Sequence, residues 1–206
     1  MASHSDLRSR LRRAMRQRRR ALSPREQRLA AARLAKLVSR SRSFLRARHI
    51  AAYLANDGEL DPAELVAMAW RLGKRVYLPV LRRDRSLRFA LYRPGTILRR
   101  NPLGIPEPVN TRLLPPSRMD CVFMPLVAFD TQGNRLGMGG GFYDRTFAFL
   151  HRRHRWGRPL LIGLAHGCQQ SPEVPAESWD VAMAAIATDR GFVATGQTTE
   201  QTRRIV

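Results

Sequence analysis

A glycine-rich segment at residues 135–145 gives the strongest chemical signal in the sequence. It holds four glycines within five positions, between a predicted strand and a predicted helix: Gly137, Gly139, Gly140 and Gly141. Such a loop leaves backbone N–H groups free to surround phosphate oxygens, and the following helix start adds partial positive charge. The segment matches neither the P-loop pattern nor the Gly-x-Gly-x-x-Gly pattern. It therefore predicts a phosphate-binding loop of another type, although a flexible surface turn could carry the same glycines.

Two charged residues that flank the glycines favour the phosphate interpretation. Arg135, before the loop, can donate a charge-assisted hydrogen bond to a phosphate. Asp144, after it, offers the hard oxygen ligand that Mg²⁺ prefers. The sequence contains no Gly-x-Ser-x-Gly or comparable nucleophile motif, so covalent catalysis by such a serine is not predicted.

Histidines and cysteines give a weaker signal. His151 and His154 are three residues apart and His166 lies two residues before Cys168, but no acidic ligand pattern accompanies them, so we do not predict a zinc site. The chain has 2 cysteines, too few for a disulfide framework. Cys121 lies in an apolar run typical of a buried free thiol, which agrees with a reducing compartment.

The formal net charge of +21 is concentrated near the N-terminus. Residues 1–48 hold 16 basic side chains against two acidic ones, Asp6 and Glu26. Such a segment attracts polyanions, whether nucleic acid, anionic lipid or a polyphosphate ligand. An Arg-rich, acid-poor start also resembles a mitochondrial transit peptide. The strong preference for Arg over Lys across the chain is equally consistent with genome composition, which weakens the charge as a sign of function.

The elements that must position these groups follow from the periodicity of the sequence. Apolar residues at helical spacing predict a basic helix over residues 6–22. A capping box at Ser23 and Glu26, with Pro24 at the first helical position, predicts a second helix that runs to about residue 41 through the apolar Leu29, Ala32, Leu34 and Leu37. Strands are expected at residues 49–54, 75–79, 88–92, 120–126, 160–165 and 184–188, helices at 61–73 and 142–154, and irregular structure in the proline-rich segment 93–119.

Alternating strands and helices predict an α/β fold: a three-layer α/β/α sandwich with a Rossmann-like, mostly parallel sheet and a basic N-terminal helical segment. At 206 residues the chain is expected to form one domain, residues 1–206, that includes the basic helices at about 6–41. No apolar run reaches the ~18 residues that a membrane-spanning helix requires.

The glycine-rich segment also resembles a family signature. Arg-Leu-Gly-x-Gly-Gly-Gly-(Tyr/Phe)-Tyr-Asp-Arg is typical of 5-formyltetrahydrofolate cyclo-ligases, also called methenyltetrahydrofolate synthetases. Other segments follow the family's order across roughly residues 7–190: the basic helix, the Ser-Pro-Arg-Glu joint, Glu59, Gly-Ile-Pro-Glu-Pro at 104–108 and Trp179-Asp180. The resemblance implies an ATP-dependent ligase that acts on a reduced folate.

The resemblance also implies roles for individual residues. ATP binding falls on Arg8, Arg12, Arg135, Leu136, Gly137, Met138, Gly139, Gly140, Gly141, Phe142 and Tyr143. Folate binding falls on Glu59, Met138 and Phe142, Mg²⁺ binding on Asp144 and Asp180, and the catalytic roles on Arg135 and Asp144. Three positions depart from the family pattern: Arg8 replaces the usual Lys, Phe142 the commoner Tyr, and Leu103 an aromatic found in some relatives.

The implied reaction is the ATP-dependent cyclisation of 5-formyltetrahydrofolate to 5,10-methenyltetrahydrofolate through an N5-iminium phosphate, with release of ADP and phosphate. The implied partners are ATP, 5-formyltetrahydrofolate and Mg²⁺, and we expect a cytoplasmic monomer that does not bind membranes. The alternative is a nucleic-acid-binding protein of the same fold that uses the Arg-rich N-terminal helix as its phosphate contact. That alternative accounts for the charge of residues 1–48 but not for the glycine loop, Glu59 and Asp144 together.

Overall fold

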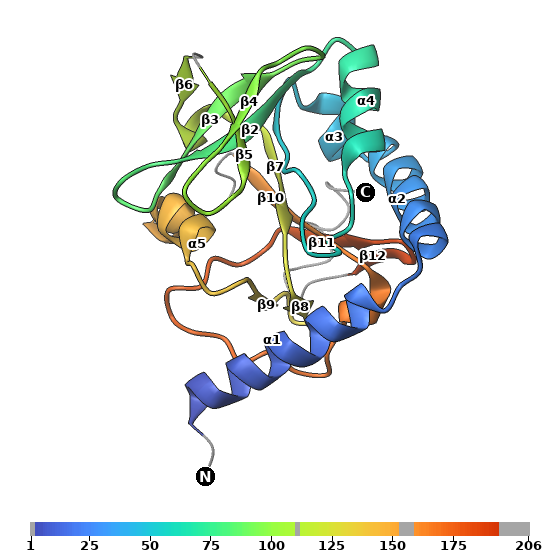
Figure 1. Ribbon diagram of the computed structural model, residues 1–206, viewed down its shortest axis with the longest axis vertical. Coiled ribbons are helices and arrows are strands. Elements are labelled where there is room, and N and C mark those ends of the chain that lie inside the picture. Colours follow the sequence, from blue (N-terminus) through green and yellow to red (C-terminus); the bar gives the residue numbers. More distant parts are fainter. Residues whose placement is uncertain (1–2, 110–111, 153–158, 194–206) are drawn as a thin grey trace.

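The computed structural model describes residues 3–109, 112–152 and 159–193, and an eight-stranded sheet lies at its centre (Figure 1). The strands are arranged in the order β12-β11-β10-β7-β1-β2-β3-β6. Their bounds are β1 His49–Ala51, β2 Arg75–Leu81, β3 Leu87–Tyr92, β6 Leu113–Leu114, β7 Cys121–Pro125, β10 Leu160–Ala165, β11 Ala185–Thr188 and β12 Gly191–Val193. The five strands from β2 to β11 pair in parallel, and β3, β6 and β12 pair antiparallel to their neighbours. The predicted α/β fold with a mostly parallel sheet and N-terminal helices is confirmed.

The predicted strand–helix–strand unit is present near the middle of the chain. β1 leads into α4 (Ala63–Arg71), and β2 then pairs in parallel with β1, with Ile50 opposite Val76. β7 pairs with the other edge of β1. The carboxyl ends of β1, β2 and β7 therefore meet at one edge of the sheet, where open α/β sheets bind their ligands.

The N-terminal helices form much as the sequence predicts. α1 spans His4–Arg20 and α2 spans Pro24–Ser39, followed by the short α3 at Arg42–Arg46. The predicted capping box is confirmed, because Ser23 and Glu26 bond reciprocally between backbone and side chain.

The buried face of α2 differs from the prediction. We expected Leu29 on the apolar stripe, but it is 48% exposed, and the buried positions are Ala30, Ala31, Leu34, Ala35 and Val38. These positions recur at intervals of three and four residues, which places them on one side of the helix. Small alanines let that side lie close to the sheet.

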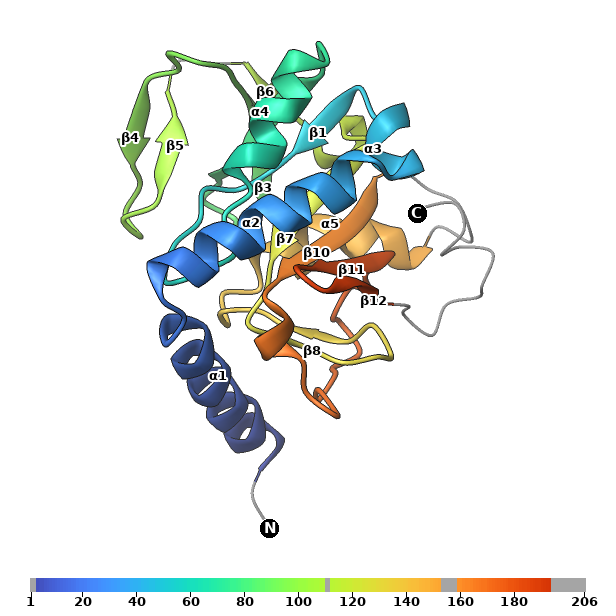
Figure 2. The same ribbon diagram turned by 90° about the vertical axis from the view of Figure 1, so that its right-hand side faces the viewer.

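Helices lie on both faces of the sheet, but unequally (Figure 2). α2, α3 and α4 cover one face, and their side chains share a core with Ile50, Phe123 and Ile162. The other face is covered by the short α5 (Phe142–Phe147) and the 3-10 helix η2 (Ala148–Arg152). α5 starts where the sequence predicts, but the expected helix to residue 154 was wrong within its described part, because it turns into η2 after Phe147. Residues 153–158 lie outside the described ranges.

Residues 93–119 are more regular than expected. β4 (Leu98–Arg100) and β5 (Pro106–Pro108) form a separate hairpin, and β6 and a 3-10 helix, η1 (Pro116–Arg118), follow. Prolines were the reason to expect a loop here, but a two-stranded hairpin has free edges at which proline is tolerated. Figure 2 shows this hairpin standing apart from the main sheet.

A second small hairpin carries the glycine-rich segment. β8 (Ala128–Phe129) pairs with β9 (Arg135–Leu136), and the buried Asp130 organises the turn between them. Its carboxylate accepts hydrogen bonds from the backbone of Gln132, Asn134 and Val174 at 2.9–3.0 Å. This network fixes the point from which the glycine loop departs. In the described part of the chain, no helix combines the length and the apolar character needed to span a bilayer.

Candidate functional site

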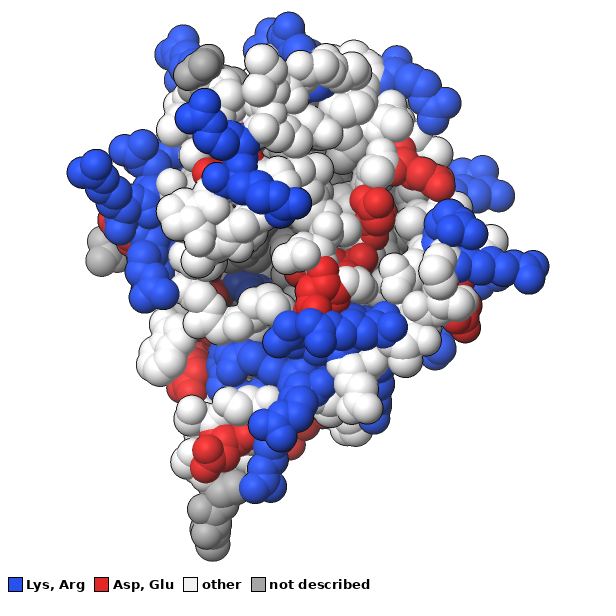
Figure 3. Space-filling view, viewed as in Figure 1, with Lys and Arg blue, Asp and Glu red and all other residues white. Residues whose placement is uncertain are grey.

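A cavity of ≈ 830 Å³ lies among the carboxyl ends of the parallel strands, the glycine loop, α1 and the β4–β5 hairpin. This volume is within the usual range for small-molecule sites. Figure 3 shows a hollow in this face, with basic and acidic side chains around it. The cavity brings together predicted site residues from four separate parts of the chain: Arg8, Arg12, Glu59, Arg135, Gly137, Met138, Gly139, Gly140, Gly141, Phe142, Tyr143, Asp144 and Asp180.

The glycine loop has a conformation that side chains would disturb. Gly139 has a φ of +103° and Gly141 a φ of +65°, both in the region that favours glycine. A Cβ atom on Gly140 would lie 2.4 Å from the ring of Phe142, so the ring folds directly over that glycine. The loop therefore exposes backbone to the cavity, as close approach of a phosphate requires.

Leu136 does not contribute to the cavity in the way the resemblance implied. Its side chain is buried with Met15, Val127 and Val174, and it does not line the cavity. Its carbonyl oxygen accepts a hydrogen bond from the N–H of Val127 at 2.7 Å. As the last residue of β9, the apolar Leu136 anchors the start of the glycine loop in the core.

Arg135 and Asp144 form an ion pair that closes the base of the glycine loop. The Arg135 side chain is 4% exposed and that of Asp144 is 16% exposed. Asp144 also accepts a hydrogen bond from the backbone N–H of Val181 at 3.2 Å. Within the described residues, the buried Nε of Arg135 has no hydrogen-bond partner. A buried donor without a partner is costly, so this guanidinium is suited to an anionic ligand.

α1 contributes two further guanidinium groups from one helical face. Arg8 donates to the Asp180 carboxylate at 2.8 Å and to the carbonyl of Pro175 at 2.9 Å. Arg12, one turn later, donates its Nε–H to the carbonyl of Gly137 at 2.9 Å. Burial and the nearby Arg8 lower the pKa of Arg12, while Asp180 opposes this effect. In the part of the chain that the structure describes, Arg12 forms no ion pair, and its charge is therefore available to a ligand.

The two predicted metal ligands lie in the same cavity. Asp144 and Asp180 each accept hydrogen bonds from an arginine, Arg135 and Arg8 respectively. Two carboxylates beside the glycine loop are a donor set that suits Mg²⁺, which commonly takes one or two carboxylates plus substrate phosphates. No group of three or more His, Cys, Asp or Glu residues with metal-binding geometry occurs among the described residues. His154, one of the histidines considered for zinc, lies outside the described ranges.

Glu59 also lines the cavity, from the loop that follows β1. Its side chain is 11% exposed, and one carboxylate oxygen accepts the backbone N–H of Asn56 at 3.1 Å. Burial raises the pKa of Glu59, and the nearby Arg19 opposes that rise. Met138 is half exposed at the cavity, and the guanidinium of Arg85 lies 6.0 Å from the centre of the Phe142 ring. Together these residues offer one carboxylate and apolar surface, which suits a heteroaromatic ring with N–H donors.

Sequence reasoning missed several residues that line or support the cavity. Trp179 is exposed at its rim, and Glu107 accepts hydrogen bonds from Leu81 and Asn101 in its wall. Buried Arg19 was counted only as one of many arginines. The i, i+3, i+4 spacing of Arg16, Arg19 and Arg20 could have indicated a shared acidic partner, but in so Arg-dense a helix this spacing occurs repeatedly.

Comparisons with known proteins agree with this geometry. The model of the 5-formyltetrahydrofolate cyclo-ligase family matches residues 4–189. The 5-formyltetrahydrofolate cyclo-ligase of Escherichia coli is 44% identical over 178 residues, which cover 84% of this chain and 96% of that protein. That of Haemophilus influenzae is 45% identical over 139 residues, or 66% of this chain and 72% of that protein.

Solved structures give the same result for the fold. The 5,10-methenyltetrahydrofolate synthetase of Aquifex aeolicus superposes with a TM-score of 0.79 at 27% identity, over 93% of this chain and 94% of that one. The extent of the family match and the similarity to the bacterial enzymes agree with the cavity geometry. The chain belongs to the 5-formyltetrahydrofolate cyclo-ligase family.

Proposed function

We propose that this chain uses ATP to cyclise 5-formyltetrahydrofolate to 5,10-methenyltetrahydrofolate, releasing ADP and phosphate. Membership of the family and the 44% identity to the Escherichia coli cyclo-ligase support this activity. One structural observation carries the proposal furthest. A single cavity combines a glycine loop bonded to the Arg12 guanidinium with the buried carboxylate of Glu59, so two substrates of different chemistry can meet there.

The reaction needs no nucleophile from the protein. In the first step the 5-formyl oxygen attacks the γ-phosphorus of ATP, the bond to the β–γ bridging oxygen breaks, and ADP leaves. The product is an N5-iminium phosphate. N10 then adds to the activated carbon and loses its proton, and phosphate departs as the methenyl bridge forms. Protein side chains contribute by positioning both substrates and by stabilising charge on the transferring group.

Three arginines are placed to stabilise that charge. We assign Arg12 and Arg135 to the ATP phosphates, since one has no carboxylate partner and the other has a buried N–H without an acceptor within the described residues. Arg8 is assigned to the same role, although it now pairs with Asp180. Asp144 and Asp180 would hold Mg²⁺, which neutralises phosphate charge when bound. Binding of the nucleotide would then exchange arginine–aspartate pairs for arginine–phosphate and aspartate–metal contacts.

On the folate side we assign Glu59, Met138 and Phe142. The carboxylate of Glu59 can accept hydrogen bonds from N–H groups of the pterin, while Met138 and Phe142 offer apolar surface to its ring. Phe142 lacks the hydroxyl of the commoner Tyr, so only its ring contributes.

The activity is tested by following the absorbance of the methenyl product. We expect the chromophore to form only when the protein, ATP, Mg²⁺ and 5-formyltetrahydrofolate are all present. Reactions that lack ATP serve as the control. If the purified protein forms no chromophore and calorimetry detects no folate binding, the proposed function is wrong.

Replacing Arg12 by alanine is expected to weaken ATP binding far more than folate binding. A hydrogen bond to a charged group contributes roughly 1.5–3 kcal/mol, or roughly a 10- to 150-fold change in Kd. Arg13→Ala is the matched control, because Arg13 is the next residue of α1 and is exposed. Separate calorimetric titrations with MgATP and with folate measure both affinities.

The same variants test the nucleic-acid alternative. If Arg12→Ala keeps its ATP affinity but is retained less on an RNA column than Arg13→Ala, then Arg12 contacts nucleic acid and its assignment to ATP is wrong. A loss of ATP affinity with equal RNA retention in both variants supports the enzyme.

Several finer predictions accompany this proposal. We propose that the architecture is a three-layer α/β/α sandwich of Rossmann-like type, which the helices on both faces of the sheet support. The single domain over residues 1–206, the monomeric state and the cytoplasmic location stay predictions.

A further inference from the structure

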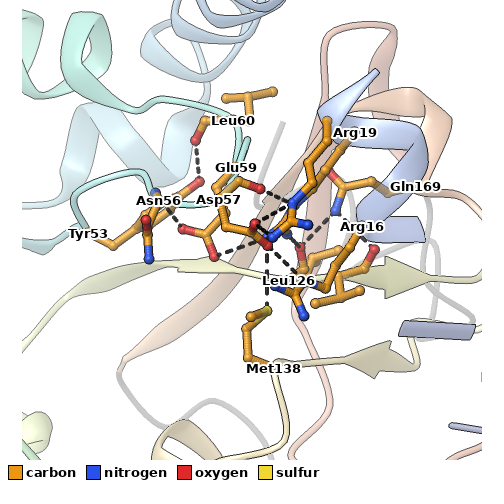
Figure 4. A network of polar contacts seen from close by, with 12 residues as sticks. Arg16, Arg19, Tyr53, Asn56, Asp57, Glu59, Leu60, Leu126, Met138 and Gln169 are labelled. Carbon is orange, nitrogen blue, oxygen red and sulfur yellow. Dashed lines mark hydrogen bonds and ion pairs between the residues drawn. The ribbon is translucent and has the colours of Figure 1, made fainter. Parts of the chain in front are cut away.

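Arg19 is the only arginine among the largest fully buried side chains of the described residues, with 0% of its side chain exposed (Figure 4). It projects from the last turn of α1, seven residues after Arg12 and therefore on a similar side of the helix. A buried guanidinium destabilises a protein unless its donors find acceptors and its charge finds a partner. The contacts of Arg19 therefore show what its burial achieves.

Those contacts are all made with residues that line the cavity. Arg19 donates its Nε–H to the carbonyl of Asp57 at 2.8 Å, one Nη group to the Asp57 carboxylate at 2.8 Å, and the other to the carbonyl of Leu126 at 3.2 Å. The Met138 sulfur lies 3.9 Å from Nη2, and so does a carboxylate oxygen of Glu59. All four partner residues line the cavity, whereas Arg19 does not. Arg19 therefore touches no ligand space itself but contacts residues that do.

The loop that Arg19 holds has an unfavourable backbone conformation. Asp57 has a φ of +55°, which few non-glycine residues adopt, and Gly58 follows with a φ of +72°. The carboxylate of Asp57 also accepts hydrogen bonds from Arg16 and Arg20 (Figure 4 shows the Arg16 contact). Partial burial raises the pKa of Asp57, but the hydrogen bonds from these arginines lower it to about 2, so Asp57 is ionised at neutral pH. The end of α1 thus stabilises a strained turn two residues before Glu59.

We propose that Arg19 is a positioning residue for the reaction: it holds the 56–59 loop in the shape that presents Glu59 to the folate, and it supplies the fixed positive charge next to that carboxylate. This inference rests on the proposed function and adds a residue to it. It also gives α1 two tasks. Arg8 and Arg12 are assigned to the ATP phosphates, and Arg19, from the same helix, positions the carboxylate assigned to the folate.

The charge of Arg19 should be visible in the pH dependence of folate use. The ionisable groups that face Glu59 are Arg19 from α1, Asp57 from the same loop, Tyr53 after β1 and Tyr143 from α5. Burial raises the pKa of Glu59, Arg19 lowers it and Asp57 raises it. Removal of Arg19 therefore raises this pKa further, and protonation of Glu59 begins at a higher pH.

The test compares Arg19→Met, which removes the charge, with Arg19→Lys, which keeps it but cannot make the forked contacts. Arg18→Met is the matched control, because Arg18 is the preceding residue and is exposed. For each protein, KM for ATP, KM for 5-formyltetrahydrofolate and the pH profile of kcat/KM for the folate are measured.

Arg19→Met is expected to raise KM for the folate by roughly tenfold or more, as for one lost hydrogen bond to a charged group, and to leave KM for ATP nearly unchanged. The acidic limb of its pH profile of kcat/KM for the folate should move to higher pH. Arg19→Lys should keep the acidic limb of the wild type, with an intermediate KM for the folate. Arg18→Met should match the wild type in both respects.

Two results would overturn the inference. The first is an Arg19→Met protein in which neither KM for the folate nor the acidic limb of the pH profile changes. The second is an Arg19→Met protein in which kcat falls and both KM values rise while the acidic limb stays in place, which would indicate a purely structural role. If Arg19→Met does not fold, Arg19→Lys and Asp57→Asn take its place in the test. The inference then requires Asp57→Asn to raise KM for the folate but not KM for ATP, and an unchanged KM for the folate would contradict it. An inactive wild type contradicts the proposed function, whereas an active wild type with these results contradicts only the role of Arg19.

Discussion

Replacing Asp144 by asparagine is expected to lower kcat by roughly 100-fold or more, the scale on which loss of one preorganised electrostatic contact acts. Asp144 lies at the end of the glycine loop, pairs with Arg135 and faces the same cavity as Asp180. In the proposed reaction it would hold Mg²⁺, and an amide is a poorer ligand than a carboxylate for this cation. The loss should be only partly restored at high Mg²⁺ concentration, which a titration of initial rates measures.

The same substitution is also expected to destabilise the protein. Arg135 is buried, and removing one partner of a buried ion pair costs about 3–5 kcal/mol because a charge is left without compensation. Rates should therefore be measured well below the melting temperature, with urea denaturation in parallel.

Two further variants separate stability from catalysis. Asp144→Glu keeps the charge, and the double variant Arg135→Met/Asp144→Asn removes both charges. The double variant should recover much of the stability of Asp144→Asn and none of its activity. A double variant that regains activity together with stability would show that Asp144 is structural, as would an Asp144→Asn protein with wild-type kcat across the Mg²⁺ titration.

Structural features that depend on residues close together in the chain could be predicted from the sequence. The capping box of Ser23 and Glu26, the start of α5 after Gly141 and the parallel pairing of β1 with β2 all follow from local spacing and backbone preference. The glycine loop was also evident, because few other structures require four glycines in five positions.

Structural features that depend on the tertiary environment could not be predicted from the sequence. Arg19 and Arg13 both lie in the Arg-dense helix α1, and nothing in their sequence neighbourhood distinguishes them. Packing against the 56–59 loop buries Arg19, whereas Arg13 stays exposed to solvent. Leu29 looked like a core residue because leucine usually is, but the sheet accepts the alanine side of α2 instead. Pro106 and Pro108 argued against strands, since sequence cannot show that their hairpin has free edges.

Glu59→Gln is expected to weaken folate binding by roughly 1.5–3 kcal/mol, or roughly 10- to 150-fold in Kd, without weakening the fold. The amide keeps the shape of the side chain, and its oxygen can still accept the N–H of Asn56, but it loses the negative charge that pairs with pterin N–H donors. MgATP affinity should change little, because within the described residues Glu59 forms no ion pair with the three arginines assigned to the ATP phosphates. Glu64→Gln is the matched control, since Glu64 is an exposed carboxylate on α4.

The direction of the pKa shift gives this prediction two further signatures. Burial raises the pKa of Glu59 in the folded protein, so the folded state binds the proton more tightly than the unfolded chain does. Stability contributed by this group is therefore lost as the pH rises from its unfolded pKa through its folded pKa, and at neutral pH the ionised carboxylate costs the folded state free energy. Because glutamine avoids this cost, the melting temperature of Glu59→Gln at neutral pH should equal or exceed that of the wild type.

Folate affinity should show the converse dependence on pH. In the wild type it should fall as the pH drops through the raised pKa of Glu59, whereas in Glu59→Gln that decline should be absent. Calorimetric titrations with 5-formyltetrahydrofolate over a range of pH measure both curves. Equal affinities for the wild type and Glu59→Gln would place the pterin elsewhere in the cavity, and a decline that persists in the variant would assign the titration to another group. A loss of folate affinity together with an unchanged or higher melting temperature is the combination that a binding carboxylate produces and a structural one does not.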